Sequence, residues 1–252
     1  MLSLREFLYK LHKPPIHLLA CLVFGGLPTT GFTQSVTNAY GLNVISDSYI
    51  LLQTIKSNDS MKMVDLKTAI PGLLIDLRYS SRGNFMHTRL YPSSTKTTYL
   101  RKPAAAALAK AQAIFNERNL SIKIWDAYRP YSVTVKMWEP VKDDRYAADP
   151  KVGSGHNRGA AVDITLVDLK TFKELDMGTA FDSFSDTAHV GFKSLPPEIL
   201  ANRQILQSVM EAQGFKVLDT EWWHFYLPDA KKYPLLDLSF SQLKKLNKAT
   251  HK

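Results

Sequence analysis

The chain has 252 residues, a formal net charge of +9 and 45% hydrophobic residues, which is enough for one well-buried core. Charged residues of both signs are mixed along it, and no basic stripe alternates with aromatic residues, so nucleic-acid binding is not expected. The excess of lysine and arginine instead predicts a solvated basic surface. Its single cysteine, Cys21, rules out a disulfide within the chain.

The first 33 residues have the pattern of a signal peptide or an N-terminal anchor. Three basic residues precede an apolar run over residues 16–27, and polar residues follow it. That run is shorter than the roughly 20 residues needed to span a bilayer. Cys21 is interpreted as an ordinary member of the run, with a lipidated cysteine as the alternative. The expected location is a bacterial periplasm, with membrane contact only through this segment.

The remaining sequence predicts a single α+β domain. No regular structure is expected over 34–60, and the folded domain is expected over 61–252. Helices are indicated by proline in a first turn, by alanine-rich composition and by a terminating glycine, and strands are indicated by alternating apolar residues. These are strands over 72–79, 121–126, 162–166 and 221–226, and helices over 103–117 and from Pro196 to Gly214. Helices interspersed among strands predict an antiparallel sheet with flanking helices.

Two short motifs supply two imidazoles and two carboxylates. His156 lies in a glycine-rich loop that leads into the strand carrying Asp163, and the last strand carries Glu221 and His224. Two histidines and one aspartate are three ligands, which leave one tetrahedral position of a zinc ion open, as in catalytic sites. The pattern therefore predicts a zinc peptidase in which Glu221 moves protons beside the metal.

Glu221 and His224 are three positions apart, which would place them on opposite faces of a regular strand. Their convergence requires a bulge or turn over 220–222, and we predict one there. The alternative is that Glu221 is a surface residue and only His224 belongs to the site. Trp222 and Trp223 are expected to pack around the site without a chemical role.

Arg129 follows directly after the strand over 121–126, and Pro130 ends that strand. The end of a strand is a usual place for a functional side chain, and a fixed guanidinium there can stabilise a developing oxyanion. A plain surface charge is the alternative. His87 and His189 are further imidazoles that we expect to stand outside the site, with a fourth metal ligand or a substrate contact as the alternative.

The motifs Ser154–Asp163, Glu221–His224 and Trp125–Pro130 together resemble the D-alanyl-D-alanine dipeptidases, the VanX-like branch of the zinc DD-peptidases of peptidase family M15. Residues 76–79, 83–85 and 176–182 extend the resemblance over about 61–235. It implies a hedgehog/DD-peptidase-type fold and one Zn²⁺ per chain. It assigns metal binding to His156, Asp163 and His224, acid–base catalysis to Glu221, and transition-state stabilisation to Arg129.

The same resemblance implies that the substrate is the free dipeptide D-Ala-D-Ala, with Ser154 and Asp182 recognising its termini. The best-known members are cytoplasmic, so an exported chain points to dipeptide scavenging or peptidoglycan turnover. No obligate protein partner is expected.

Three other functions remain open. The first is a zinc D,D-carboxypeptidase or endopeptidase acting on muropeptides, and residues 176–186 should decide whether the site is closed or forms a groove. The second is a non-catalytic, zinc-stabilised envelope binding protein. The third is a basic protein that binds anionic polymers.

Overall fold

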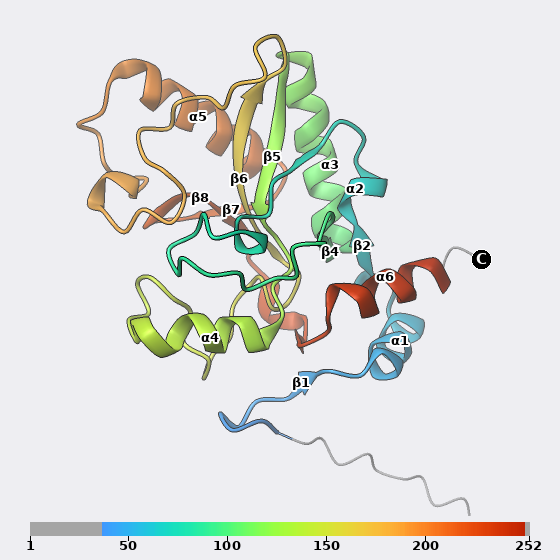
Figure 1. Ribbon diagram of the computed structural model, residues 1–252. Coiled ribbons are helices and arrows are strands. Elements are labelled where there is room, and N and C mark those ends of the chain that lie inside the picture. The colour runs from blue at the N-terminus through green and yellow to red at the C-terminus, as the bar shows by residue number, and fades with distance from the viewer. Residues whose placement is uncertain (1–36, 250–252) are drawn as a thin grey trace, which may run out of the picture. The chain divides into compact units, whose positions relative to one another are not determined.

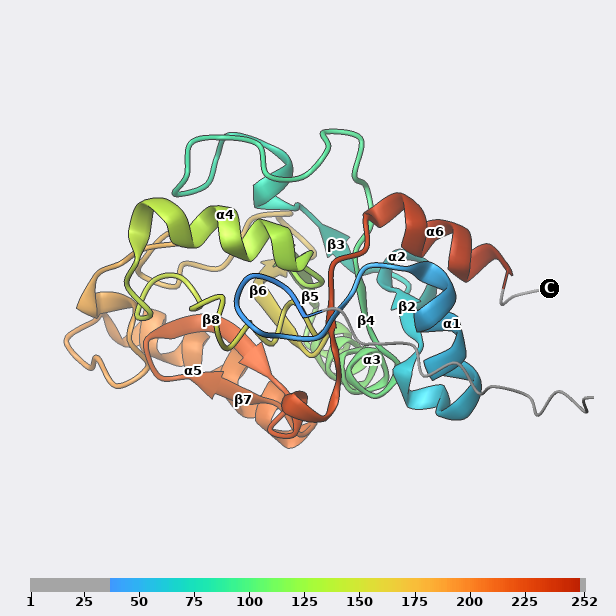
Figure 2. The same ribbon diagram turned by 90° about the horizontal axis from the view of Figure 1, so that it is seen from below.

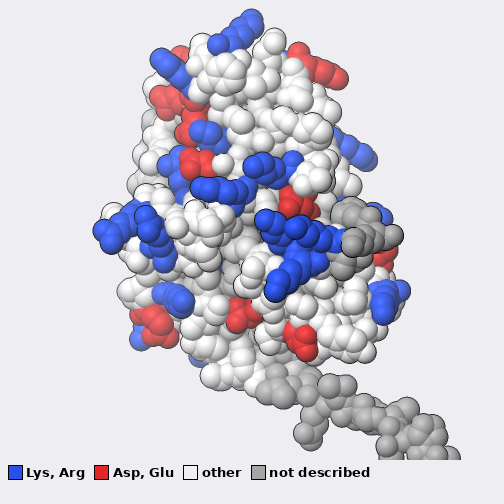
Figure 3. Space-filling view, turned by 45° about the vertical axis from the view of Figure 1, so that its right-hand side comes forward, with Lys and Arg blue, Asp and Glu red and all other residues white. Residues whose placement is uncertain are grey.

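The computed structural model describes residues 37–249. The signal peptide or anchor predicted over 1–33, and Cys21 within it, lie outside the described residues. Within the described range, no helix has the length and apolar character to cross a membrane. On the face drawn in Figure 3, lysine and arginine side chains lie among aspartate and glutamate side chains without forming one continuous stripe.

A five-stranded sheet with the order β3-β5-β6-β8-β7 organises the domain (Figure 1). Its strands are β3 (Leu74–Ile75), β5 (Leu120–Asp126), β6 (Ala161–Asp168), β7 (Lys216–Leu218) and β8 (Glu221–Tyr226). β3 runs parallel to β5, whereas every other neighbouring pair is antiparallel. The predicted α+β fold is confirmed, but the sheet is mixed and not purely antiparallel. A helix connects β3 to β5, and such a crossover returns the chain in the same direction.

Two small sheets and six helices complete the described part of the chain. The small sheets pair β1 (Val44–Ile45) with β9 (Leu235–Leu236), and β2 (Met63–Asp65) with β4 (Tyr99–Arg101). The helices are α1 (Ser48–Ser57), α2 (Leu66–Ala69), α3 (Lys102–Glu117), α4 (Tyr131–Val141), α5 (Pro197–Ala212) and α6 (Phe240–Ala249). α3 and α5 contact each other on one side of the sheet, while α4 lies on the other side (Figure 2).

Most predicted elements occur where their sequence signals place them. α3 begins one residue before Pro103, which occupies the first turn, where its missing N–H costs nothing. α5 begins at Pro197, and the chain leaves it through Gly214, whose φ of +90° suits glycine. The strand predicted over 72–79 is shorter, because the backbone turns into a 3₁₀ helix at Arg78–Ser80.

The sequence predicts a poorly defined segment over 34–60, and the structure differs over part of it. α1 forms there, with the Asp47 carboxylate accepting a hydrogen bond from the Tyr49 N–H at 2.8 Å as an N-cap. Leu51 is its one fully buried residue. Leu51 and Ile55 are four positions apart and lie on one face of the helix, so the sequence did carry a short helical signal here.

The two faces of the central sheet have different roles. Ile122, Ile124 and Ile164 are fully buried and alternate with residues of the opposite face. That opposite face carries Trp125 from β5 and Asp163 from β6. One face therefore builds the core, and the other is free to present functional side chains.

Candidate active site

The three predicted metal ligands converge at the edge where β6 and β8 pair. The ligand atoms of His156, Asp163 and His224 all lie within 4.8 Å of one another. Asp163 pairs with His224 across the strands, and His224 Nδ1 lies 2.9 Å from Asp163 Oδ1. His156 Nε2 lies 3.2 Å from His224 Nδ1. Strand register thus brings two of these side chains together, and the preceding loop supplies the third.

Close packing of the loop positions His156. Its Nδ1 lies 2.7 Å from the Ala127 carbonyl oxygen, which can only accept a hydrogen bond. The Nε2 lone pair is consequently free to face the other two ligands. A Cβ at Gly155 would stand 2.9 Å from the Ala161 Cβ, and one at Gly159 would stand 2.6 Å from the Met63 Cε. Glycine at 155 lets the loop approach β6, and glycine at 159 lets it approach Met63 of β2, so the imidazole can turn inward.

Glu221 reaches the same cluster through an irregular pairing of β7 with β8. Val217 pairs with Phe225, yet the next residue, Leu218, pairs with Glu221, so extra residues of β8 lie between the two partners. A bulge was predicted over 220–222 to bring Glu221 and His224 to the same face. The observed irregularity has this effect, although it extends further along β8. Glu221 Oε2 lies 3.8 Å from His224 Nδ1. Burial raises the pKa of Glu221 to about 7, even though His224 opposes the shift.

The pKa of Asp163 is shifted in the opposite direction to that of Glu221. Burial alone would raise its pKa, but the two imidazoles, His156 first, lower it well below the usual range. Its carboxylate therefore stays ionised, as a metal ligand must.

Arg129 is held by a buried carboxylate that the sequence analysis did not single out. Its Nε and one terminal nitrogen each lie 2.9 Å from Asp126 Oδ2, and Tyr91 donates a hydrogen bond to Asp126 Oδ1 at 2.7 Å. The guanidinium also stacks on the Tyr79 ring at 5.1 Å and lies 3.8 Å from Asp163 Oδ2. The three-residue spacing of Asp126 and Arg129 at the end of β5 is the feature of the sequence that indicates this ion pair.

Asp182 lines the same cavity as the metal ligands, and Tyr79 holds it by a hydrogen bond. The Tyr79 hydroxyl donates to Asp182 Oδ1 at 3.0 Å, and the Phe85 N–H donates to Oδ2 at 3.4 Å. Burial and, next, the negative charge of Asp163 raise the pKa of Asp182 to about 7. Tyr79 had no assigned role in the sequence, although it stands within the 76–79 motif.

Ser154 lies beside the metal ligands with a defined hydroxyl orientation. Its Oγ accepts a hydrogen bond from the His156 N–H at 3.0 Å. Because the oxygen already accepts at this contact, its proton remains available to a ligand.

All seven predicted site residues line one cavity of about 410 Å³. They are Arg129, Ser154, His156, Asp163, Asp182, Glu221 and His224. His87 and His189 are not among its lining residues. Aromatic contacts connect the surrounding loops, with Phe184 lying 5.3 Å from Phe85 and 4.6 Å from Tyr146 between ring centroids. The cavity is thus bounded by strands on one side and by aromatic loops on the other.

A family model described as D-ala-D-ala dipeptidase, Peptidase_M15, matches residues 59–245, a range that contains every residue of the cluster. The D-alanyl-D-alanine dipeptidase of Escherichia coli (strain K12) is 39% identical over 184 residues, covering 73% of this chain and 94% of that protein. Those of Streptomyces coelicolor and Enterococcus faecalis are 29% and 27% identical, covering 64% and 67% of this chain and 88% and 92% of those proteins. The chain belongs to the D-Ala-D-Ala dipeptidase family of M15 peptidases.

Proposed function

We propose that this chain hydrolyses free D-Ala-D-Ala to two D-alanine molecules and that its metal is Zn²⁺, held by His156, Asp163 and His224. One observation carries the proposal. A buried cluster of two imidazole nitrogens and one carboxylate lines the same small cavity as a proton-transfer carboxylate and a fixed guanidinium.

The donor set fits zinc. Two imidazole nitrogens and a carboxylate oxygen are ligands of catalytic zinc sites, and three protein ligands leave a further position open. The Ala127 carbonyl fixes the His156 tautomer, as outer partners of zinc ligands commonly do. When bound, zinc supplies Lewis acidity, which activates water and polarises the scissile carbonyl group.

Glu221 is the proposed general base and general acid. A pKa of about 7 lets its carboxylate accept the proton of the attacking water and then donate that proton to the leaving amine. Its position beside His224 keeps it close to the ligand cluster without being one of the three ligands.

Arg129 is the proposed stabiliser of the oxyanion that develops on the attacked carbonyl oxygen. Asp126 fixes the guanidinium by two contacts to one oxygen, so little reorganisation is needed when negative charge appears. The burial of Arg129 strengthens that interaction, because water does not screen it.

We assign recognition of the dipeptide termini to Asp182 and Ser154. The Asp182 carboxyl group, which lines the cavity, suits the α-ammonium group, whose charge would stabilise the ionised form. The free proton of the Ser154 hydroxyl suits a carboxylate oxygen.

The size of the site favours the dipeptide over a muropeptide. Phe184, together with Phe85 and Tyr146, brings three loops into contact around a cavity of about 410 Å³. Phe184 lies in the 176–186 segment that was expected to decide between a closed site and a groove. We expect an extended chain to meet Phe85 and Tyr146, which line the cavity.

We also propose that residues 1–33 direct export, that 61–252 is the catalytic domain, and that the chain acts in the periplasm in dipeptide scavenging or peptidoglycan turnover. The basic and apolar pattern of the N-terminal segment supports this proposal. Cell fractionation of the tagged full chain tests it, and recovery in the cytosol would contradict it.

The function itself is tested with the full-length, zinc-loaded protein. D-Alanine release is followed from free D-Ala-D-Ala and, separately, from a muropeptide that ends in D-Ala-D-Ala, each with and without chelator. We expect chelator-sensitive cleavage of the free dipeptide alone. Cleavage of the muropeptide would favour a carboxypeptidase, and cleavage of neither would favour a binding protein.

A further inference from the structure

A smaller cavity of about 190 Å³ adjoins the catalytic one, and Ser154, Gly155 and His224 line both of them. Arg158 and Lys231 line only the smaller cavity. Among the described residues, no aspartate or glutamate lines it, and we therefore call it the basic cavity. It adjoins the catalytic cavity at Ser154, the residue assigned to the carboxylate end of the dipeptide.

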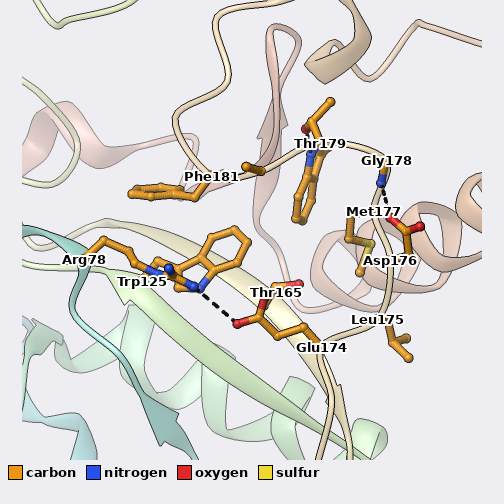
Figure 4. Close-up of a pocket in the computed structure, with 12 residues that line it drawn as sticks. Arg78, Trp125, Thr165, Glu174, Leu175, Asp176, Met177, Gly178, Thr179 and Phe181 are labelled. Carbon is orange, nitrogen blue, oxygen red and sulfur yellow. Dashed lines mark hydrogen bonds and ion pairs between the residues drawn. The ribbon is translucent and has the colours of Figure 1, made fainter. Parts of the chain in front are cut away.

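A larger cavity, of about 590 Å³, shows the contrasting case of a cation that is already neutralised (Figure 4). There the Arg78 guanidinium forms ion pairs with Glu174 at 3.4 Å and with Asp76 at 3.3 Å. Glu174 and Asp176 both line that cavity, so its carboxylates outnumber its cations. An anion has no reason to enter it, whereas the basic cavity has the reverse balance of charge.

The Arg158 guanidinium is held in place without a counter-ion. Its two terminal nitrogens donate hydrogen bonds to the backbone carbonyl oxygens of Tyr233 at 2.6 Å and Val152 at 3.3 Å. Partial burial lowers the pKa of Arg158, and no carboxylate of the described chain opposes that shift. Carbonyl oxygens satisfy N–H groups but leave the positive charge in place. A half-buried cation of this kind is stabilised by an anion that binds beside it.

Lys231 adds a second positive charge that solvent can reach. It is exposed and lies in the short 3₁₀ helix Ala230–Lys232 that follows β8. Asp229, the acidic residue next to this helix, forms its ion pair with Lys232. Within the described part of the chain, the Lys231 ammonium group therefore has no ion pair, and a ligand can contact it without breaking one.

We propose that the basic cavity receives the C-terminal carboxylate of the substrate. The Ser154 hydroxyl binds this carboxylate where the two cavities adjoin, and Arg158 and Lys231 supply the positive charge that selects a free carboxylate. Both are thus specificity-determining residues of the same site. Only the identity of the ligand as D-Ala-D-Ala rests on the proposed function, because a carboxypeptidase would need the same free carboxylate.

The basic cavity also fixes the direction in which the dipeptide binds. Asp182 lines the catalytic cavity but not the basic cavity, so the site has an acidic end and a basic end. A dipeptide with its ammonium group at Asp182 and its carboxylate at Arg158 and Lys231 is attracted at both ends. The reversed dipeptide would place its ammonium group beside two cations and is therefore disfavoured.

The test measures the binding of D-Ala-D-Ala by calorimetry to the full-length, zinc-loaded Glu221→Ala protein, which should not consume the ligand. In that background we expect Lys231→Gln to raise Kd by about threefold, because an exposed charge pair is lost. Lys231→Glu should raise it by about tenfold, because repulsion replaces attraction, and Lys231→Arg should leave it unchanged. D-Alanyl-D-alaninamide, which lacks the carboxylate charge, should bind more weakly, with a Kd that does not depend on residue 231.

Lys232→Gln is the matched control, because Lys232 is also exposed but pairs with Asp229 and does not line the basic cavity. It should leave the Kd of both ligands unchanged. Equal effects of Lys231→Gln and Lys232→Gln would mean that only the overall surface charge matters, and this would overturn the inference. An unchanged Kd in Lys231→Glu, or no binding of D-Ala-D-Ala at all, would also overturn it.

Hydrolysis of D-Ala-D-Ala by the unaltered protein decides the proposed function separately. Cleavage together with a Kd that ignores residue 231 would keep the proposed function and reject this inference. Binding that depends on Lys231 in a protein that does not cleave the dipeptide would support the inference and reject the proposed function.

Discussion

The two sides of the catalytic cavity are built in different ways. The metal side, which consists of His156, Asp163 and His224, is set by the pairing of β6 with β8 and by a tightly packed glycine loop. The substrate side, which consists of Tyr79, Phe85 and Asp182, lies on segments that connect the strands and long helices. On the metal side the pKa of Asp163 is lowered, whereas the pKa of Asp182 on the substrate side is raised to about 7. Asp163, on a strand, thus stays ionised, whereas the charge of Asp182, on a connecting segment, changes near neutral pH.

Glu221→Ala tests whether proton transfer can be separated from the metal side. We expect kcat to fall by about 10²–10⁴-fold, because the general base and acid is lost, while metal content stays at one ion per chain. Metal analysis beside the kinetics distinguishes the two effects. Glu211→Ala, on the exposed surface of α5, is the matched control. Loss of the metal from the Glu221 variant would make Glu221 a ligand and would move it to the metal side.

Arg129→Ala tests the guanidinium that lies between the two sides. We expect kcat to fall by about 10²–10³-fold, as when one oxyanion donor is removed. Arg203→Ala serves as a control, because Arg203 is equally buried but bonds backbone carbonyls and does not line the catalytic cavity. Unchanged turnover of the Arg129 variant would remove this residue from the chemistry.

Asp182→Asn should act on substrate binding and spare the metal side. We expect KM for D-Ala-D-Ala to rise by about tenfold or more, because a charged hydrogen bond to the ammonium group is lost, with a smaller change in kcat. Asp186→Asn, in the same segment but outside the catalytic cavity, is the control. A fall in kcat with unchanged KM would argue against a role in ground-state recognition.

The smallest expected effect is on stability as a function of pH. Asp182 has a raised pKa of about 7 in the folded protein and one near 3.8 when unfolded, so the folded state binds a proton that the unfolded chain releases. Its contribution to stability is therefore present at low pH and is lost as the pH rises from about 4 to about 7. Denaturant unfolding of metal-free protein should show a loss of stability over this pH range that Asp182→Asn lacks. Parallel profiles of the two proteins would contradict the raised pKa.

The sequence predicted the parts of the site that depend on local pattern. His156, Asp163 and His224 stand in short motifs, and an alternating strand reveals which residues share a face. The role of Asp126 could not be predicted, because it depends on a hydrogen bond from Tyr91, which is distant in the chain and contacts Asp126 only in the folded core. Tyr79 was missed for a similar reason, since its partner Asp182 belongs to a segment with no regular structure.

In the fold, too, the parts that depend on local pattern were predicted and the parts that depend on tertiary contacts were not. The helices at 102–117 and 197–212 have proline at their starts and long apolar faces, so their positions follow from composition. β3 has only two residues, which is too short for a readable period, whereas α1 has apolar residues at helical spacing within a segment that is otherwise polar. The parallel direction of β3 depends on a tertiary pairing that no local pattern encodes.

The pairing of β1 with β9 has a consequence for the order of folding. Val44 and Leu235 lie near opposite ends of the described chain, so this parallel contact closes a very long loop. Contacts of that kind form late, because loop closure must be completed before they stabilise the chain. During synthesis β1 therefore stays without its partner until β9 has emerged, whereas the strands of the central sheet, which lie between them in the chain, can pair earlier.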